Sequence, residues 1–410
     1  MKKASIISVG NELLAGLIVN TNAGYLSREL LSMGIPTVSC YTVGDRIDSI
    51  AEAIAQAAQQ ADIILITGGL GPTGDDLTRQ SLARFMGVQL EFNEELLAQM
   101  SEFFTKRDIK MSANNKVQAY IPVGAEAIAN NVGTAPGIMT ERDGKIFVCL
   151  PGVPAEMKQM FAESVADRFR QAAGGQVVLM RKIRCFGTGE SVIAEKLGDL
   201  MQRDRNPLIN CTVSGGIITL HIVATATDRA GAEEMIEKDA RQLRALLGDL
   251  VYGRDEETLA EVVGAQLRSC RKRLSVAESC TGGLIGKLLT DVPGSSDYFT
   301  YGWVTYSNEA KIRELGVDGA LIKKHGSVSA EVALAMAKGA RARADTDFAI
   351  AVTGIAGPGG GTEEKPVGLI YIAVDSSELR DVQQYIFAHT REHIRYRAAL
   401  MAINMLRLRL

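Results

Sequence analysis

The alternation of short apolar runs with amphipathic helical segments over the first ninety residues is the feature that most constrains the fold. Buried strands separated by helices pair in parallel, and the helices cover the sheet. Ligands of such sheets bind at the carboxyl ends of the strands. The sequence therefore predicts an α/β domain with a parallel sheet, with strands over residues 4–9, 36–43 and 63–67 and helices over residues 22–33, 47–60 and 76–86.

Two glycine-containing loops follow strands of this sheet and should meet at that edge. They read GNELLAG at residues 10–16 and TGGLGPTGDD at residues 67–76. The second has GxGxxG spacing, but it follows the third strand and Pro72 interrupts it, so we reject a dinucleotide fingerprint. Glycine N–H groups bind phosphate oxygens, and a carboxylate holds the divalent cation that phosphates carry. The alternative is that Asp75 and Asp76 only cap the next helix.

Two breaks in the pattern divide the chain, and we predict domains over residues 1–172, 176–250 and 256–410. The glycine-rich segment 172–176 is the first break, and VYGRDEET at residues 251–258 is the second. The middle domain is a small α+β unit that is KH-like in its pattern. It lacks the GxxG clamp of RNA-binding KH modules, so we expect a spacer or dimerisation domain.

The last domain contains AESCTGG at residues 277–283 and TYSNEAK at residues 305–311. A strand predicted over 274–278 and a helix over 282–290 place Ser279 in the turn between them. Amide N–H groups at a helix start favour a phosphate or a developing oxyanion. Lys311 lies in the first turn of the next helix, where burial and a neighbouring positive helix end lower a lysine pKa. A Ser-Lys amidohydrolase is the resulting hypothesis.

Other interpretations of these motifs stay open from the residues alone. Cys280 is a rival nucleophile, because a helix N-terminus lowers the pKa of a thiol. The turn is also compatible with a plain helix cap whose glycines allow tight packing. The loop GIAGPGGGTEEKPVG at residues 354–368 either wraps a phosphate or lies loosely on the surface.

The composition limits the class of protein. The 410 residues are 46% hydrophobic and 23% charged, with a formal net charge of −3 and no dense basic block, which argues against a nucleic-acid partner. Six dispersed cysteines without a CxxC motif indicate reduced thiols in the cytoplasm. The apolar runs are too short for a signal peptide or a membrane span, so we expect neither export nor membrane insertion.

The motifs, taken together, resemble the CinA family over the full length of the chain. GNELLAG, NTNA, TGGLGPTGDDLTR, NNVGTAPG and LPGVPAEM resemble its molybdopterin-biosynthesis-type N-terminal domain. AESCTGG, PGSS, VTYSNEAK, GSVS and TGIAGPGGGTEEKPVG resemble its C-terminal domain, which is also found alone as nicotinamide mononucleotide deamidase. The middle domain matches through GTGES and its position.

The resemblance implies that the C-terminal domain, an α/β deamidase domain, converts nicotinamide mononucleotide and water to nicotinate mononucleotide and ammonia, for pyridine-nucleotide recycling and without a cofactor. Ser279 matches the family's nucleophile, Lys311 the base, and Tyr306 a hydroxyl that assists proton transfer. The residues expected to contact the substrate are Thr281, Gly282, Gly283, Thr353 and Arg395.

The resemblance also implies that the N-terminal domain is an ADP-ribose pyrophosphatase that uses a divalent metal (Co, Mn or Mg) and yields AMP and ribose 5-phosphate. The diphosphate would contact Gly68, Gly69, Gly71 and Thr73, and the metal would be placed by Asp76, Asp75 and Glu12. Relatives of this domain bind molybdopterin precursors, so the alternative is a nucleotide- or molybdopterin-binding regulatory protein with at most one active site. We further expect a homodimer formed through the first two domains.

Overall fold

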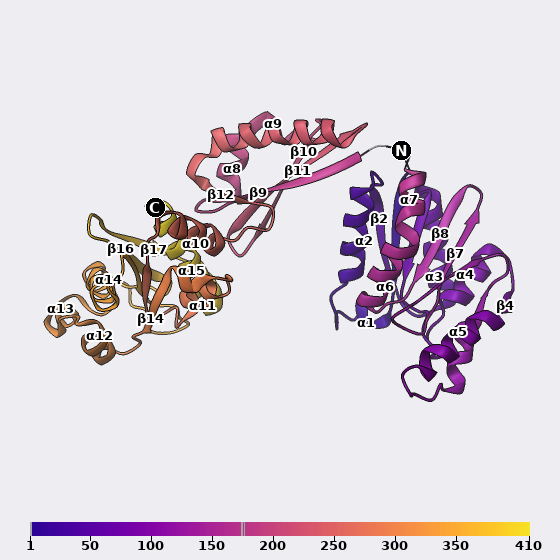
Figure 1. Ribbon diagram of the computed structural model, residues 1–410, viewed down its shortest axis with the longest axis horizontal. Coiled ribbons are helices and arrows are strands. Elements are labelled where there is room, and N and C mark those ends of the chain that lie inside the picture. The colour runs from indigo at the N-terminus through magenta and orange to yellow at the C-terminus, as the bar shows by residue number, and fades with distance from the viewer. Residues whose placement is uncertain (1, 174, 176) are drawn as a thin grey trace. The chain divides into compact units, whose positions relative to one another are not determined.

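The computed structural model describes residues 2–173, 175 and 177–410, and it divides into two compact units (Figure 1). The first unit contains Met1–Leu179 and Ala224–Met235, and the second contains Met180–Val223 and Ile236–Leu410. The predicted break at 172–176 includes residues 174 and 176, which lie outside the described residues, as does residue 1.

A six-stranded sheet with the order β2-β1-β3-β8-β7-β6 forms the first unit. The strands β2, β1, β3 and β8 pair in parallel as predicted, whereas β7 and β6 add an antiparallel edge because β7 and β8 form a hairpin. The bounds are β1 (Ala4–Val9), β2 (Thr37–Val43), β3 (Ile63–Thr67), β6 (Glu126–Ile128), β7 (Gly137–Arg142) and β8 (Lys145–Leu150). A separate two-stranded sheet joins β4 (Leu90–Phe92) to β5 (Tyr120–Pro122).

Helices cover both faces of this sheet because alternate strand residues point to opposite sides. Ile6 and Leu65 pack under α2, α6 and α7, while Ile7 and Ile66 pack under α3 and α4 (Figure 1). The bounds are α1 (Asn11–Leu14), α2 (Thr21–Ser32), α3 (Ile47–Gln60), α4 (Thr78–Met86), α5 (Glu94–Thr105), α6 (Pro154–Met160) and α7 (Ala166–Ala172), with a 3-10 helix at Ala113–Ala119 and a π-helical turn at Phe161–Val165.

The KH-like segment, most of which belongs to the second unit, contains a four-stranded sheet with the order β10-β11-β9-β12. Its hairpin joins β10 (Leu208–Ser214) to β11 (Ile217–Ala226), and β9 (Val177–Cys185) pairs with β12 (Val251–Arg254). The helices of this segment are α8 (Glu190–Leu197), a 3-10 extension at Gly198–Met201, α9 (Arg229–Leu247), and a 3-10 turn at Gly248–Leu250.

A five-stranded sheet with the order β14-β13-β15-β16-β17 forms the rest of this unit. One face packs on α10, α11 and α15, and the other packs on α14. The strands are β13 (Leu274–Glu278), β14 (Phe299–Val304), β15 (Phe348–Gly354), β16 (Leu369–Asp375) and β17 (Arg380–Ile386). The helices are α10 (Leu259–Cys270), α11 (Leu284–Thr290), a 3-10 turn at Ser295–Asp297, α12 (Asn308–Leu315), α13 (Gly319–His325), α14 (Ala330–Ala344) and α15 (Arg391–Arg407).

Element boundaries differ from the sequence predictions at both glycine-rich turns. Helix α11 begins at Leu284 rather than residue 282, because Gly282 and Gly283 adopt positive φ angles of 60° and 92°. Helix α4 begins at Thr78 rather than residue 76, because the Asp76 carboxylate accepts a hydrogen bond from the Thr73 N–H within the loop. The loop GNELLAG, predicted to be irregular, contains α1. These differences leave the turns longer than expected.

Candidate active sites

Ser279 and Lys311 lie side by side at the carboxyl end of β13. Ser279 directly follows that buried strand, and its N–H donates to the Val352 carbonyl at 3.0 Å, which fixes the turn to the neighbouring strand β15. The Lys311 Nζ lies 3.1 Å from the Ser279 Oγ, although 32 residues separate the two in sequence. Helix α12 is capped by Ser307, and this start places Lys311 in the first turn, as predicted. The arrangement pairs a hydroxyl with an amine at hydrogen-bonding distance.

Burial makes this amine a base near neutral pH. Lys311 is 1% exposed, and burial lowers the pKa of its ammonium group to about 8. Its Nζ also donates to the Thr305 carbonyl at 2.8 Å and the Tyr306 carbonyl at 3.2 Å. A neutral amine has two N–H donors, which these carbonyls accept, so its lone pair is left to accept the Ser279 proton. The geometry suits proton abstraction from Ser279.

Cys280, the rival nucleophile, is in a different electrostatic state. Its side chain is buried, and burial raises the pKa of the thiol to about 12. Since the thiolate is the nucleophilic form, this thiol is unreactive at neutral pH. The structure therefore favours Ser279 over Cys280 on chemical grounds.

Two side chains whose role here was not predicted from the sequence hold the turn after Ser279. The buried Glu278 carboxylate accepts the N–H groups of Gly283, Ile285 and Gly286 at 3.0, 3.1 and 2.8 Å. From α15, Arg395 donates to the Cys280 carbonyl at 3.1 Å and the Thr281 carbonyl at 2.6 Å. The start of α11 is thus capped from within the protein, so its N–H groups are used for rigidity.

A cavity of about 460 Å³ opens beside Ser279 and Lys311. Its described lining includes three basic residues, of which Lys365 and Arg391 are cationic beside the candidate base Lys311, and no aspartate or glutamate. Lys365 donates to the carbonyls of His325 and Val328, so it also holds the loop that contains them. The cavity is therefore positively charged and suits an anionic ligand.

The predicted site residues of this domain fall into two groups. Ser279, Lys311, Tyr306 and Thr353 line the cavity. Tyr306 is 63% exposed and its hydroxyl accepts a hydrogen bond from the Arg391 guanidinium at 3.2 Å, while Thr353 donates to the Ser327 carbonyl at 2.7 Å. The cavity lining does not include the described residues Thr281, Gly282, Gly283 and Arg395.

The first unit holds a second cavity, of about 400 Å³, where the loops after β1, β3 and β8 meet. All seven site residues predicted for this domain line it: Glu12, Gly68, Gly69, Gly71, Thr73, Asp75 and Asp76. Its described lining holds five carboxylates, with Asp45 and Glu156 added to the three predicted ones, and no lysine or arginine. This cavity therefore has the opposite charge from the first.

The carboxylate oxygens of this second cavity are the type of ligand that hard divalent cations prefer. The Asp75 and Asp76 carboxylates accept from Thr73, whose N–H lies 2.8 Å from the Asp76 Oδ2, and the hydrogen bond from Thr73 lowers the pKa of the exposed Asp75. Among the described residues, no three His, Cys, Asp or Glu side chains are grouped closely enough to hold a metal by themselves. Mg²⁺-type cations commonly bind one or two carboxylates together with substrate phosphates. The residues fit a cation that arrives with its ligand.

Comparison with known proteins decides the family. Residues 256–410 match the CinA C-terminal domain, residues 5–171 match the family described as probable molybdopterin binding domain, and residues 180–253 match the damage-inducible protein CinA KH domain. A CinA-like protein of Synechocystis sp. is 44% identical over 413 residues, covering 99% of each chain. One of Dictyoglomus thermophilum is 42% identical over 99% of this chain and 98% of its own.

The chain belongs to the CinA family. Among solved structures, the protein CinA with unknown function from Thermoplasma acidophilum is 36% identical, with 40% of this chain and 97% of that chain covered and a TM-score of 0.38. The family assignment gives the fold class as an N-terminal molybdopterin-binding-like domain, a KH-like middle domain and a C-terminal α/β domain.

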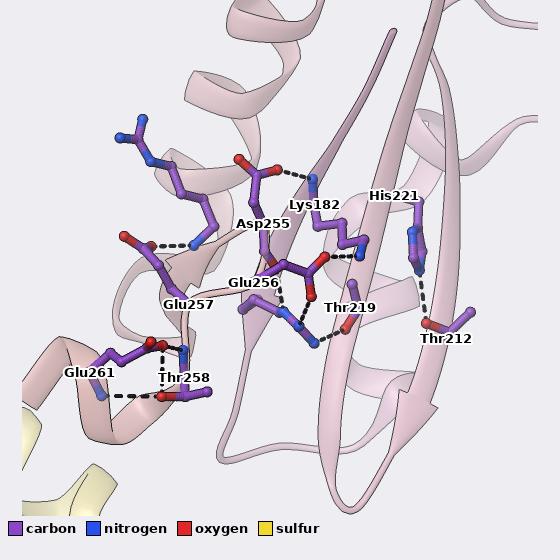
Figure 2. A network of polar contacts seen from close by, with 11 residues as sticks. Lys182, Thr212, Thr219, His221, Asp255, Glu256, Glu257, Thr258 and Glu261 are labelled. Atoms are coloured by element: carbon purple, nitrogen blue, oxygen red, sulfur yellow. Dashed lines mark hydrogen bonds and ion pairs between the residues drawn. The ribbon is translucent and has the colours of Figure 1, made fainter. Parts of the chain in front are cut away.

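The CinA KH domain has a basic run, Arg181, Lys182 and Arg184 on β9, that pairs with the segment entering the C-terminal domain (Figure 2). The Glu256 carboxylate pairs with Lys182 and with Arg184, the latter at 3.2 Å, and Arg181 pairs with Asp255 at 2.6 Å. The Asp255 carboxylate also accepts the Lys182 N–H at 3.1 Å. This basic run therefore contacts acidic groups of its own chain.

Two cavity residues of the CinA C-terminal domain were not identified from the sequence. Lys365 belongs to the glycine-rich loop TGIAGPGGGTEEKPVG, whose lysine is its single basic residue. Arg391 lies one helical turn before Arg395 on α15 and donates to the Gly357 carbonyl at 2.6 Å. Lys365 could have been predicted from the sequence, because a single basic residue in a glycine-rich loop is typical of phosphate-binding sites. The choice between two arginines on one helix required the structure.

Proposed function

We propose that the C-terminal domain is a nicotinamide-nucleotide amidase that converts nicotinamide mononucleotide and water to nicotinate mononucleotide and ammonia. The observation that carries the proposal is the Lys311 Nζ at 3.1 Å from the Ser279 Oγ, with the lysine pKa lowered to about 8. The cationic lining supports it further, because the substrate carries a phosphate that Lys365 and Arg391 would contact. The proposed pathway is pyridine-nucleotide recycling.

In the proposed mechanism, the Ser279 oxygen attacks the carboxamide carbon while the neutral Lys311 accepts its proton. The tetrahedral intermediate collapses when the C–N bond breaks, and the protonated Lys311 returns the proton to the leaving nitrogen, so ammonia departs. A water molecule then attacks the acyl ester, Lys311 accepts its proton, and Ser279 regains a proton as nicotinate mononucleotide is released. The exposed Tyr306 hydroxyl would assist these transfers from the cavity wall.

Ammonia release from nicotinamide mononucleotide by the full-length protein tests this assignment. The wild type should release ammonia, and Ser279→Ala should lose activity by about a thousandfold or more, with its folding unchanged by circular dichroism. Cys280→Ala is the matched control, because it removes the neighbouring thiol and should retain activity. Loss in Cys280→Ala alone would transfer the nucleophile role to the thiol, and no release by wild type would reject the amidase proposal.

For the N-terminal domain, we propose divalent-metal-dependent cleavage of ADP-ribose to AMP and ribose 5-phosphate. The loop with Gly68, Gly69, Gly71 and Thr73 would contact the diphosphate, and the metal would be held by Asp76, Asp75 and Glu12, which line the same cavity. When bound, a Co, Mn or Mg ion supplies Lewis acidity and orients the phosphates. The protein's own contribution is to place those carboxylates and the loop N–H groups around the diphosphate.

A separate measurement tests this second activity. AMP formation from ADP-ribose should require an added divalent cation, and Asp76→Asn should lose it while ammonia release stays at the wild-type rate. Unchanged cleavage in Asp76→Asn would indicate that other carboxylates of the cavity bind the cation. The matched control is Asp108→Asn, an exposed aspartate outside the described cavity lining.

The second candidate is a nucleotide- or molybdopterin-binding regulatory protein with at most one active site. The match of residues 5–171 to the probable molybdopterin binding domain favours it for the first unit, as does the lack of a pre-grouped metal ligand set among the described residues. Binding of ADP-ribose or of a pterin phosphate without turnover, at any metal tested, would support this candidate over the pyrophosphatase.

Location and assembly follow as part of the same proposal. Among the described residues, no helix has the length and apolar character that crossing a bilayer requires. We infer a cytoplasmic homodimer that acts on small nucleotides. Four large apolar side chains at the end of α1 and in the segment leading to α2 are more than half exposed, namely Leu14, Leu17, Ile18 and Val19. Such a patch is typical of an association surface. Light scattering of the wild type and of Leu17→Ser tests the dimer.

A further inference from the structure

A buried arginine lies directly beneath the glycine-rich loop of the first unit. Arg79, in the first turn of α4, is 3% exposed, and its guanidinium donates to the Leu70 carbonyl at 2.7 Å and the Gly71 carbonyl at 3.0 Å. Within the described part of the chain it forms no ion pair, and Asp76 acts on it only at longer range. Arginine is rarely buried to this degree without an anionic partner, because removing its charge from water is costly.

The contacts of Thr78 and Arg79 orient the loop that follows β3. The Thr78 hydroxyl donates to the Gly68 carbonyl at 2.7 Å, and the Thr78 N–H donates to the Gly69 carbonyl at 3.1 Å. With the contact from Arg79 to Leu70, three successive carbonyls point toward the start of α4.

This orientation determines where the loop N–H groups point. These peptide bonds are trans, and a planar trans peptide directs its C=O and N–H to opposite sides. The N–H groups of Gly69, Leu70 and Gly71 therefore point away from α4, and none of them donates to another described residue. Because the same residues line the 400 Å³ cavity, whereas Thr78 and Arg79 do not, the three donors are presented to the cavity.

We propose that Thr78 and Arg79 are positioning residues that hold this loop in an anion-binding conformation, and that the buried Arg79 charge compensates a diphosphate bound above it. This proposal rests on the proposed nucleotide site of the N-terminal domain. It explains how an anionic ligand could bind there despite the negative charge of the lining carboxylates. Five carboxylates line the cavity, so an anionic ligand needs a compensating cation besides the metal. Arg79 supplies that charge through the polarised peptides of the loop.

The conservative variant separates charge from geometry. Lysine keeps the positive charge but lacks the planar fork that contacts two carbonyls at once. Arg79→Lys should therefore retain part of the function, whereas Arg79→Gln should lose both contributions. Thr78→Val removes one hydroxyl and leaves the backbone contact, so its effect should be the smallest.

The experiment uses the full-length protein, titrated with inorganic pyrophosphate and with ADP-ribose in the presence of Mg²⁺ by isothermal calorimetry. Relative to wild type, the Kd should rise about thirtyfold for Arg79→Gln, about tenfold for Arg79→Lys and about threefold for Thr78→Val. The ionic-strength dependence of the Kd should weaken in Arg79→Gln and be restored in Arg79→Lys, which a purely structural role would not produce. Arg84→Gln, an exposed arginine on the same helix, is the matched control and should bind normally.

The outcomes distinguish this inference from the cleavage proposal. Pyrophosphate binding that depends on Arg79, without ADP-ribose cleavage by wild type, would keep the inference and reject the cleavage activity. Wild-type cleavage together with an unchanged Kd and KM in folded Arg79→Gln and Arg79→Lys would overturn the inference alone. If neither arginine variant folds, wild-type affinity in Thr78→Val overturns it. Absence of binding by the wild type would reject both.

Discussion

The two cavities are of similar size but carry opposite charge. The C-terminal cavity is lined by Lys311, Lys365 and Arg391 with no carboxylate among its described residues, while the N-terminal cavity is lined by five carboxylates with no lysine or arginine among its own. A phosphorylated ligand is attracted to the first without assistance, whereas it is repelled from the second unless a cation accompanies it. The difference teaches that, under the proposed function, the two units would bind phosphate in two different ways.

The cavities also differ in how far their groups are organised before a ligand arrives. Ser279 and Lys311 are buried and fixed by backbone contacts on both sides. Asp75 is exposed, and its carboxylate accepts a hydrogen bond from the neighbouring loop residue Thr73. A preorganised pair needs no rearrangement during a reaction, whereas the exposed carboxylates would be ordered by the proposed ligand and its cation.

The largest effect expected from this comparison is at Lys311. Lys311→Met should reduce ammonia release by about a thousandfold or more, because it removes the base and leaves the Ser279 proton in place. ADP-ribose cleavage in the same sample should be unchanged, since that cavity lies in the other unit. Lys287→Met is the control, as Lys287 is an exposed lysine paired with Asp291 on α11. Residual activity above a tenth of wild type would contradict the base assignment.

Metal removal should separate the two cavities next most clearly. Treatment with a chelator should lower ADP-ribose cleavage by about a hundredfold or more, because the cation supplies several kcal/mol of charge stabilisation. The proposed amidase rate should not change, since its cavity already contains the cationic residues Lys365 and Arg391. Equal sensitivity of both reactions would show that the charge difference does not decide the metal requirement.

The cationic lining itself predicts a smaller effect, on binding. Arg391→Gln should raise the KM for nicotinamide mononucleotide roughly tenfold to thirtyfold with little change in kcat, because a charge-assisted contact to phosphate is lost. The nearby Arg397→Gln, outside the described cavity lining, is the control. A fall in kcat at constant KM would instead place Arg391 in the chemical step through its contact with Tyr306.

The pH dependence of the proposed amidase activity should be the mildest difference. Burial lowers the pKa of Lys311 to about 8, so the neutral, basic form increases as pH rises through that value. The rate should therefore increase about tenfold from pH 7 to pH 9 and level off above it. Measuring kcat/KM across that range tests the sign, and a rate that falls with rising pH would contradict a neutral lysine base.

Much of this organisation was predictable from the sequence because it depends on local pattern. The strand over 274–278 was predicted with its observed bounds, and the helix start at Asn308 placed Lys311 in the correct turn. What could not be predicted depends on partners distant in sequence. The Glu278 carboxylate accepts hydrogen bonds from backbone N–H groups that we expected to contact a ligand. Arg395 donates to carbonyls of the turn, whereas Arg391 lines the cavity. Local spacing does not determine which of several donors meets which acceptor.

The pairing of Glu256 with Lys182 and Arg184 bears on how this protein should be divided for experiments. A cut between the KH-like and C-terminal domains would leave both cations on β9 without their counter-charge. The excised fragment should then attract nucleic acids and other polyanions more strongly than the intact chain, in which Glu256 pairs with both cations. RNA binding by such a fragment should therefore be compared with that of the intact chain before it is assigned to the KH-like domain.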